Sequence, residues 1–102
     1  MHSARDRLEY DGWLEEIDRV ADRLDLSAEA RSNALDLFLA DVPDSDRSKR
    51  AVLAASVYAG SLIAGDGRTQ SDVAEAADVS RLSIQKRWKT LLEDAGLEPP
   101  RW

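Results

Sequence analysis

The sequence predicts an all-α fold, a bundle of five helices, and three observations support this. Apolar residues recur at helical spacing in five stretches, which Gly, Pro and Ser residues separate. Runs that alternate apolar and polar residues, the pattern of half-buried strands, are absent from the sequence. Hydrophobic residues make up 43% of the 102 residues and aromatic residues only 6%, so we expect one small domain with a core of Leu, Val, Ile and Ala.

The first two expected helices cover about residues 11–24 and 28–41. In each, the apolar residues form one stripe while the charged residues lie largely elsewhere. Ser27 is placed to cap the second helix, and Pro43 ends it at the start of a polar turn. The stripes are Trp13, Ile17, Val20, Ala21 and Leu24 in the first helix, and Ala34, Leu35, Phe38, Leu39 and Val42 in the second.

The third expected helix, roughly Lys49 to Ala64 with Ser48 as its cap, is apolar on nearly every side. A helix without a polar face is surrounded by other elements, so we expect this one at the centre of the bundle. The longest uncharged run has fifteen residues, fewer than the roughly 20 that span a bilayer. We therefore expect a cytoplasmic protein without a membrane segment or a signal peptide.

The last two expected helices form a helix-turn-helix over residues 69–95. Thr69 begins a capping-box spacing, so the fourth helix covers about Gln70 to Ala77. Residues 78–80 form a tight turn, and the fifth helix then covers about Arg81 to Ala95. A short capped helix, a three-residue turn and a second helix are the parts that this motif requires. The predicted domain is therefore residues 11–96, with a flexible tail over 1–10 and another over 97–102.

The charge of the chain is negative and unevenly distributed. Twenty acidic and fourteen basic residues give a net charge of −6, which taken alone argues against a nucleic-acid binder. Residues 1–46 carry a net charge of −8, whereas residues 47–102 carry +2. Thirteen of the acids are Asp and only three of the bases are Lys, a composition that suits concentrated salt. We therefore expect a halophilic cytoplasm, with an ordinary acidic protein as the alternative.

Catalysis and metal binding are disfavoured by the residues available. The sequence has no Cys, which excludes disulfides and thiolate sites, and its single histidine, His2, lies in the predicted tail. The Gly65-x-Gly67 segment is too short for a phosphate-binding loop. We therefore expect neither an enzyme nor a bound metal or cofactor.

The last expected helix carries the strongest functional signal. Ile84, Trp88, Leu91 and Leu92 fall on one face, which we expect to be buried. Between residues 81 and 92 there are four bases and no acid, as a helix in the major groove of DNA would need. Those bases, Arg81, Lys86, Arg87 and Lys89, suit contacts with phosphates.

Two further residues on this helix are candidates for reading bases. Leu82 is apolar on the polar face, where it can pack on a thymine methyl group, and Gln85 can bond an adenine edge. The simpler interpretation stays open, because four bases without an acid also suit a solvated helix face and a single exposed Leu is ordinary. For Trp13 and Trp88 we expect a role in the core, and for Trp102 a frayed tail.

Two blocks of the sequence carry a set of features in a fixed order. A Ser-capped, Ala-rich helix containing Tyr58-Ala59 is followed by an Arg-Thr-Gln start, a Val-Ala-Glu-Ala-Ala helix and a Val-Ser turn. The blocks are Ser48–Leu62 (SKRAVLAASVYAGSL) and Arg68–Leu91 (RTQSDVAEAADVSRLSIQKRWKTL). Together they resemble the second cyclin-like repeat of archaeal transcription initiation factor IIB. The resemblance spans about residues 11–96 and implies a five-helix cyclin-like fold with the third helix central.

The resemblance also implies a DNA-reading role for the last two helices. In that family they form a helix-turn-helix that reads the promoter element beside the TATA box in the major groove. By position, Leu82 and Gln85 match the base-contacting places, and Lys86, Arg87 and Lys89 lie around the backbone-contacting ones. The family often has Arg at the place of Gln85, so the resemblance implies a relaxed or changed sequence preference here.

A full family member also has a Cys-containing zinc ribbon that recruits RNA polymerase, and two cyclin-like repeats. The present sequence has no Cys and one repeat, so we expect a stand-alone regulator derived from the factor. Our hypothesis is a sequence-preferring, double-stranded-DNA-binding protein that acts on transcription, helped by a second copy or by a partner such as the TATA-box-binding protein. The alternatives are a protein–protein adaptor that modulates the basal transcription machinery without touching DNA, and a regulatory subunit of an enzyme.

Overall fold

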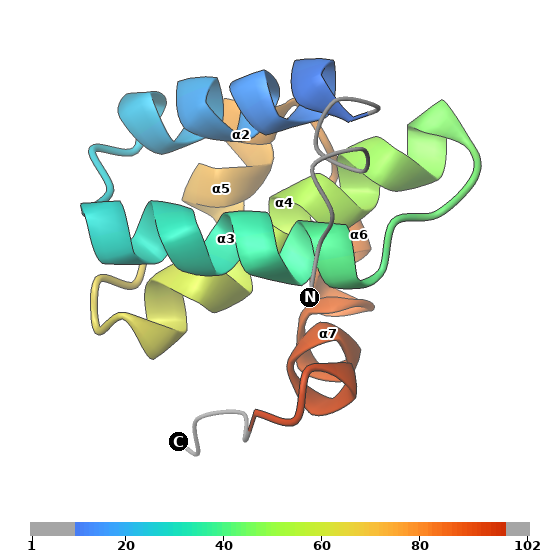
Figure 1. Cartoon of the computed structure of the whole chain (residues 1–102). Helices are drawn as coiled ribbons and strands as arrows, with labels where there is room; N and C mark the ends of the chain where they lie inside the picture. Colours follow the sequence, from blue (N-terminus) through green and yellow to red (C-terminus); the bar gives the residue numbers. More distant parts are fainter. Residues whose placement is uncertain (1–9, 98–102) are drawn as a thin grey trace.

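The computed structural model describes residues 10–97, and all regular structure within that range is helical (Figure 1). The five-helix bundle predicted from the sequence is confirmed, with the last helix divided into two segments. The predictions for His2 and Trp102, and most of both predicted tails, lie outside the described residues. The bounds 11–96 for the domain remain a prediction.

Helices α2 (Asp11–Arg23) and α3 (Ala28–Ala40) form the first pair. The Ser27 hydroxyl accepts a hydrogen bond from the Ala30 N–H at 3.2 Å, so the predicted cap of α3 is confirmed. In α3 the buried residues differ from the predicted apolar stripe, which included Leu35 and Leu39 but not Leu37. Leu37 is buried beside Phe38, whereas Leu35 and Leu39 are only partly buried.

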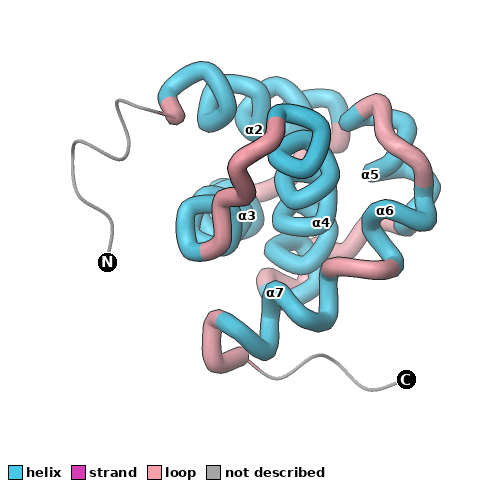
Figure 2. Tube along the Cα trace, turned by 90° about the vertical axis from the view of Figure 1, so that its right-hand side faces the viewer, coloured by secondary structure: helices cyan, strands magenta, loops and turns pink. Residues whose placement is uncertain are grey.

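Helix α4 (Asp46–Ile63) is the central helix, as the sequence predicted. Its residues 51–61 are all buried, and Figure 2 shows α3 on one side of it and α5 and α6 on the other. The predicted cap was wrong, because α4 begins three residues earlier than expected. The N-cap is Ser45 and not Ser48, because the Ser45 hydroxyl accepts a hydrogen bond from the Ser48 N–H at 3.1 Å.

A glycine brings α3 and α4 into close contact. A Cβ atom at Gly60 would lie 2.8 Å from the backbone N of Ala34 and 3.1 Å from the backbone O of Ala30. The Asn33 side-chain amide donates to the Gly60 carbonyl at 3.2 Å, which fixes the two helices in register. The two backbones can approach this closely because position 60 carries no side chain.

Helix α5 (Gln70–Ala77) and helix α6 (Arg81–Gln85) are joined by the predicted three-residue turn. The Thr69 and Ser80 hydroxyls cap them by accepting the N–H groups of Asp72 and Ser83 at 3.0 and 3.3 Å. Between them Asp78 adopts the left-handed conformation with φ of 58°. Asp tolerates this conformation better than most residues do.

The last predicted helix is interrupted, which corrects the expectation of one continuous helix over residues 81–95. It ends at Gln85 and resumes as α7 (Trp88–Asp94), and the chain turns between the two segments (Figure 2). At the interruption the Arg87 N–H bonds the Ile84 carbonyl, three residues back, at 3.0 Å. The Ser83 carbonyl, which a continuous helix would offer to that N–H, accepts the Arg87 side chain at 3.4 Å instead.

The core joins all the helices around α4. In it the ring of Tyr58 from α4 meets the ring of Trp88 from α7 edge to face, with centroids 5.3 Å apart. The predicted buried face of the last helix is confirmed, because Ile84, Trp88, Leu91 and Leu92 are all at most 5% exposed. No helix in the described range is long and apolar enough to cross a membrane.

Candidate nucleic-acid interface

The α5–turn–α6 unit is attached to the rest of the bundle by two arginines from distant helices. Arg23 of α2 donates to the Ala76 carbonyl at 2.7 Å, and Arg50 of α4 donates to the Ala77 carbonyl at 3.3 Å. These carbonyls belong to the last turn of α5, where no intrahelical donor remains for them. Both arginines therefore satisfy the end of α5 and set its direction, and with it the direction of α6.

Arg50 itself is held by two further contacts. Its guanidinium lies 5.8 Å from the centre of the Trp13 ring and donates to a Glu16 carboxylate oxygen at 3.3 Å. Glu16 also accepts a hydrogen bond from Arg19 at 2.7 Å. The hydrogen bond from Arg19, and then that from Arg50, holds the pKa of Glu16 below its ordinary value despite partial burial. The contacts of Arg50 thus link α2, α4 and α5.

The outward side of α6 carries most of the predicted site. Arg81, Gln85 and Lys86 are exposed, and Leu82 is 55% exposed, the highest value among the exposed large hydrophobic residues described. Ile84 on the opposite side is fully buried. The side chains predicted to read bases and the first two predicted phosphate contacts therefore share one accessible helix surface.

The other two predicted phosphate contacts have partners within the protein. Arg87 is half-buried and donates to the Ser83 carbonyl, so it supports the interruption between α6 and α7. Lys89 is exposed on α7, and its ammonium lies 5.5 Å from the centre of the Trp88 ring. Because of the interruption, Lys89 does not continue the surface of α6 in the register expected for one continuous helix.

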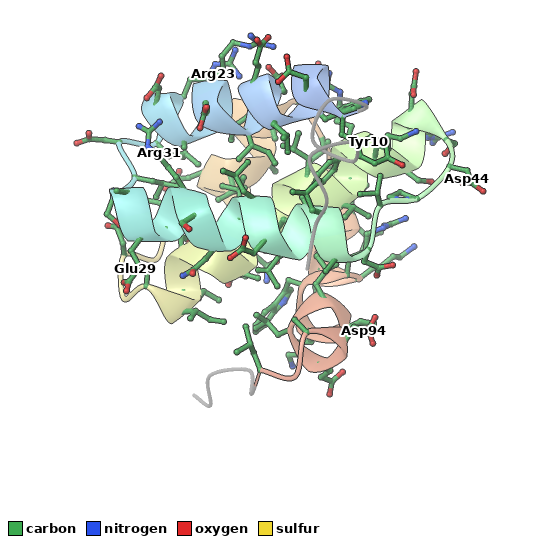
Figure 3. All side chains as sticks on the ribbon, in the orientation of Figure 1. Tyr10, Arg23, Glu29, Arg31, Asp44 and Asp94 are labelled. Carbon is green, nitrogen blue, oxygen red and sulfur yellow. The ribbon has the colours of Figure 1, made fainter. Side chains whose placement is uncertain are left out.

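Within residues 10–97, no carboxylate forms an ion pair with the basic residues of the α6–α7 segment. Each of the five ion pairs within residues 10–97 lies elsewhere; they are Arg19–Glu16, Arg31–Asp22, Lys49–Asp46, Arg50–Glu16 and Arg68–Asp66. One of them joins α3 to α2 through Arg31 and Asp22; Arg31 is labelled in Figure 3. None of these ion pairs involves Arg81, Lys86, Arg87 or Lys89, although Asp46 and Asp78 line the same pocket as Lys86 and Arg87.

The structure also brings to this surface residues that sequence reasoning did not single out. A pocket of about 880 Å³ lies between the start of α4 and α6, and its lining includes Arg47, Ser48, Leu82 and Lys86. Arg47 is exposed and follows directly on the start of α4. A cluster of bases at residues 47–50 was visible in the sequence, but its position beside α6 depends on the packing of α4.

Comparison with known proteins identifies similar sequences. Residues 13–94 match the family described as Transcription factor TFIIB repeat. The chain is 33% identical over 87 residues to transcription initiation factor IIB of Pyrococcus abyssi, an alignment that covers 82% of this chain and 29% of that protein. It is 40% identical over 81 residues to transcription initiation factor IIB 1 of Thermoplasma volcanium, covering 76% and 26% of the two chains. The chain therefore spans less than a third of the length of these curated relatives.

Proposed function

The chain belongs to the Transcription factor TFIIB repeat family, and from this premise we propose that it regulates transcription by reading promoter DNA with α6. Its helical bundle agrees with the cyclin-like fold of one such repeat. The relatives are transcription initiation factors, which supports a role connected with transcription initiation rather than with catalysis. In this proposal α5, the turn and α6 act as a helix-turn-helix.

The observation that carries the proposal is the surface of α6. An apolar side chain, Leu82, and a side-chain amide, Gln85, stand exposed one turn apart on a helix whose charged groups are all positive. In the major groove Leu82 packs on a thymine methyl group, and the Gln85 amide bonds an adenine edge. Arg81 and Lys86 flank them and contact the phosphates on either side of the groove.

The charge of the remaining surface limits the affinity of a single copy. About four phosphate contacts predict a slope of log K against log salt of roughly −3 to −4, so binding weakens steeply as salt rises. A protein of net charge −6 that works in concentrated salt therefore needs help to stay on DNA. That help comes from a second copy of the chain or from a partner already on DNA, such as the TATA-box-binding protein.

The test is DNA selection with the purified protein, followed by binding titrations across salt concentrations with and without TATA-box-binding protein. The double variant Arg81→Gln/Lys86→Gln is expected to lower affinity for the selected sites at least tenfold and to reduce the salt slope by about 2. A matched control, Ser32→Glu/Ala40→Glu, gives the same net charge through exposed positions of α3, across α4 from α6. Equal affinity of the two variants would contradict the proposal.

A second function has support from the surface of α2 and α3. Eight exposed carboxylates lie on or beside α2 and α3, at Asp11, Glu15, Asp18, Asp22, Asp25, Glu29, Asp36 and Asp41. Such a surface suits a basic protein partner, so the chain would act as an adaptor of the basal transcription machinery without contacting DNA. The same variants separate the two functions, because substitutions at Arg81 and Lys86 leave an adaptor unaffected.

A further inference from the structure

Two pockets flank α6, and its exposed side chains divide between them. Leu82 and Lys86 line the larger pocket, of about 880 Å³, which lies between α6 and the start of α4. Arg81 and Gln85 line a smaller pocket of about 470 Å³ beside Tyr58. Helix α6 therefore stands between two hollows, with one candidate base-reading residue and one basic residue on each side.

This shape has a consequence for DNA bound in the way proposed above. The major groove is about 12 Å wide, and an α-helix with its side chains measures about 10–12 Å across, so a helix in the groove nearly fills it. The two phosphate backbones then run directly beside the helix, one on each side. The strand on the Leu82 side passes over the larger pocket and comes close to its far wall.

The far wall of the larger pocket is the first turn of α4, and its exposed basic residue is Arg47. The two bases that follow have carboxylate partners within the protein. Lys49 pairs with Asp46 at 3.6 Å, and Arg50 pairs with Glu16 at 3.3 Å. None of the ion pairs described for residues 10–97 involves Arg47. Arg47 is therefore the basic residue of this wall that is placed to meet a phosphate.

The same pocket also contains negative charge. It is lined by Asp46 and Asp78, and of these only Asp46 takes part in a described ion pair. Asp78 is exposed in the turn before α6, where its backbone is left-handed. Among the described residues, the lining side chains without an ion pair are thus three bases, Arg47, Lys86 and Arg87, and one acid. A pocket with this balance attracts a phosphate, but less strongly than its bases alone would.

We propose that Arg47 contacts a phosphate of the DNA strand that Lys86 also contacts, and that the Asp78 carboxylate in the same pocket weakens this contact. The inference rests on the proposed reading of DNA by α6 and adds a second element, α4, to the interface. Arg47 and Lys86 lie on opposite walls of one pocket, so together they hold the strand from two sides and fix the depth at which Leu82 meets the bases. A phosphate contact carries no sequence preference of its own.

The first test compares Arg47→Gln with Asp78→Asn, two substitutions at exposed positions that change the charge in opposite directions. Arg47→Gln should weaken binding severalfold for selected and unrelated sequences alike, and it should reduce the salt slope by about 1. Asp78→Asn should strengthen binding severalfold, since a repulsive charge beside the phosphate is lost. Asn adopts the left-handed conformation as Asp does, so the turn and the thermal unfolding temperature should be kept.

Matched controls carry the same changes of charge on α3, across α4 from α6 (Figure 2). Ser32→Glu lowers the net charge by one, as Arg47→Gln does, and Asp36→Asn raises it by one, as Asp78→Asn does; both control positions are exposed. At physiological salt the Debye length is about 8 Å, so a charge on α3 acts only weakly on DNA at α6. Both controls should therefore bind DNA nearly as the parent protein does.

The assignment of strands provides a second, independent test. Methylphosphonates that replace single phosphates should lower affinity at defined positions of each strand. In Arg47→Gln and Lys86→Gln this loss should vanish at positions of one strand, and in Arg81→Gln at positions of the other. In Asp78→Asn the loss at the position assigned to Arg47 should grow, because neutralising that phosphate no longer relieves a repulsion.

The outcomes distinguish this inference from the function on which it rests. If the parent protein binds no DNA, both are wrong. If Arg81→Gln and Lys86→Gln weaken binding but Arg47→Gln behaves as Ser32→Glu does, the contact from α4 is wrong and base reading by α6 stands. A change on the strand assigned to Arg81 in the Arg47→Gln pattern would overturn the path of the strand. Unchanged affinity of Asp78→Asn would overturn the effect assigned to that carboxylate.

Discussion

Substitution of Gly60 by Ala is the most direct test of the packing that centres α4. The new Cβ atom would lie 2.8 Å from the Ala34 nitrogen and 3.1 Å from the Ala30 oxygen, both backbone atoms of α3. Backbone cannot rotate out of the way, so α3 must shift and the Asn33 hydrogen bond to the Gly60 carbonyl weakens. Overpacking of this kind costs about 3 kcal/mol, the upper end of its usual range.

The gain in helix propensity offsets part of this cost. Ala is favoured over Gly inside a helix by about 1 kcal/mol, which leaves a net loss of about 2 kcal/mol in the free energy of unfolding. For a chain of this length that loss lowers the melting temperature by about 10 °C. Circular dichroism during thermal and urea unfolding measures both quantities.

Gly12→Ala provides the control for this prediction. Gly12 lies in α2, and a Cβ atom there would have no neighbour within 4 Å. With no steric cost, the same substitution should stabilise the protein by about 0.5 kcal/mol, less than the full propensity difference because the site is in the first turn. A Gly60→Ala variant as stable as the parent protein, or a change of stability in the same direction in both variants, would refute the close contact of α4 with α3 at this position.

Three further predictions concern the site and the pH dependence. Arg50→Met removes the side chain that caps α5 and contacts Glu16, so DNA affinity should fall severalfold while the circular dichroism spectrum stays helical. Leu82→Ala should change the sequences recovered by DNA selection more than it changes overall affinity. The pKa of Asp66 is held below its ordinary value of 3.8 first by the Ser27 N–H and then by Arg68, so its contribution to stability is present above pH 3.8 and disappears as the pH falls below it. Acid unfolding should therefore begin at higher pH in variants that weaken these bonds, such as Arg68→Gln.

Each of these predictions has a contradicting result. Unchanged DNA affinity of Arg50→Met would show that the attachment of α5 to α2 and α4 is dispensable for binding. A uniform loss of affinity for all sequences in Leu82→Ala would assign that residue to general packing on DNA. An acid transition in Arg68→Gln at the same pH as in the parent protein would show that Asp66 does not govern this part of the pH profile.

Local patterns predicted most of the helices. Apolar spacing located the central α4, and the caps Ser27 and Thr69 followed from residue type and position. The cap of α4 was misplaced because Ser45 and Ser48 both precede the apolar run, and each satisfies the same local rule. The structure selects Ser45, so the turn after Pro43 ends three residues earlier than the sequence suggested.

The features that the sequence did not predict depend on particular side-chain contacts rather than on apolar spacing. The interruption of the last helix involves the Arg87 side chain at the Ser83 carbonyl and the Trp88 ring against Tyr58. Periodicity assumes one continuous helix and cannot register either contact. The basic residues of α6 were identifiable from the sequence, whereas the pocket beside Tyr58 exists only after α4, α5 and α6 have packed.

The attachment of α5 through Arg23 and Arg50 has a consequence for how this protein can evolve. Both arginines bind main-chain carbonyls, and every residue type presents a carbonyl at those positions. Mutations along the outer surface of α5 and α6 can therefore accumulate without changing the orientation of these helices relative to α2 and α4. Sequence change on the outer surface of this unit therefore carries little risk for the scaffold.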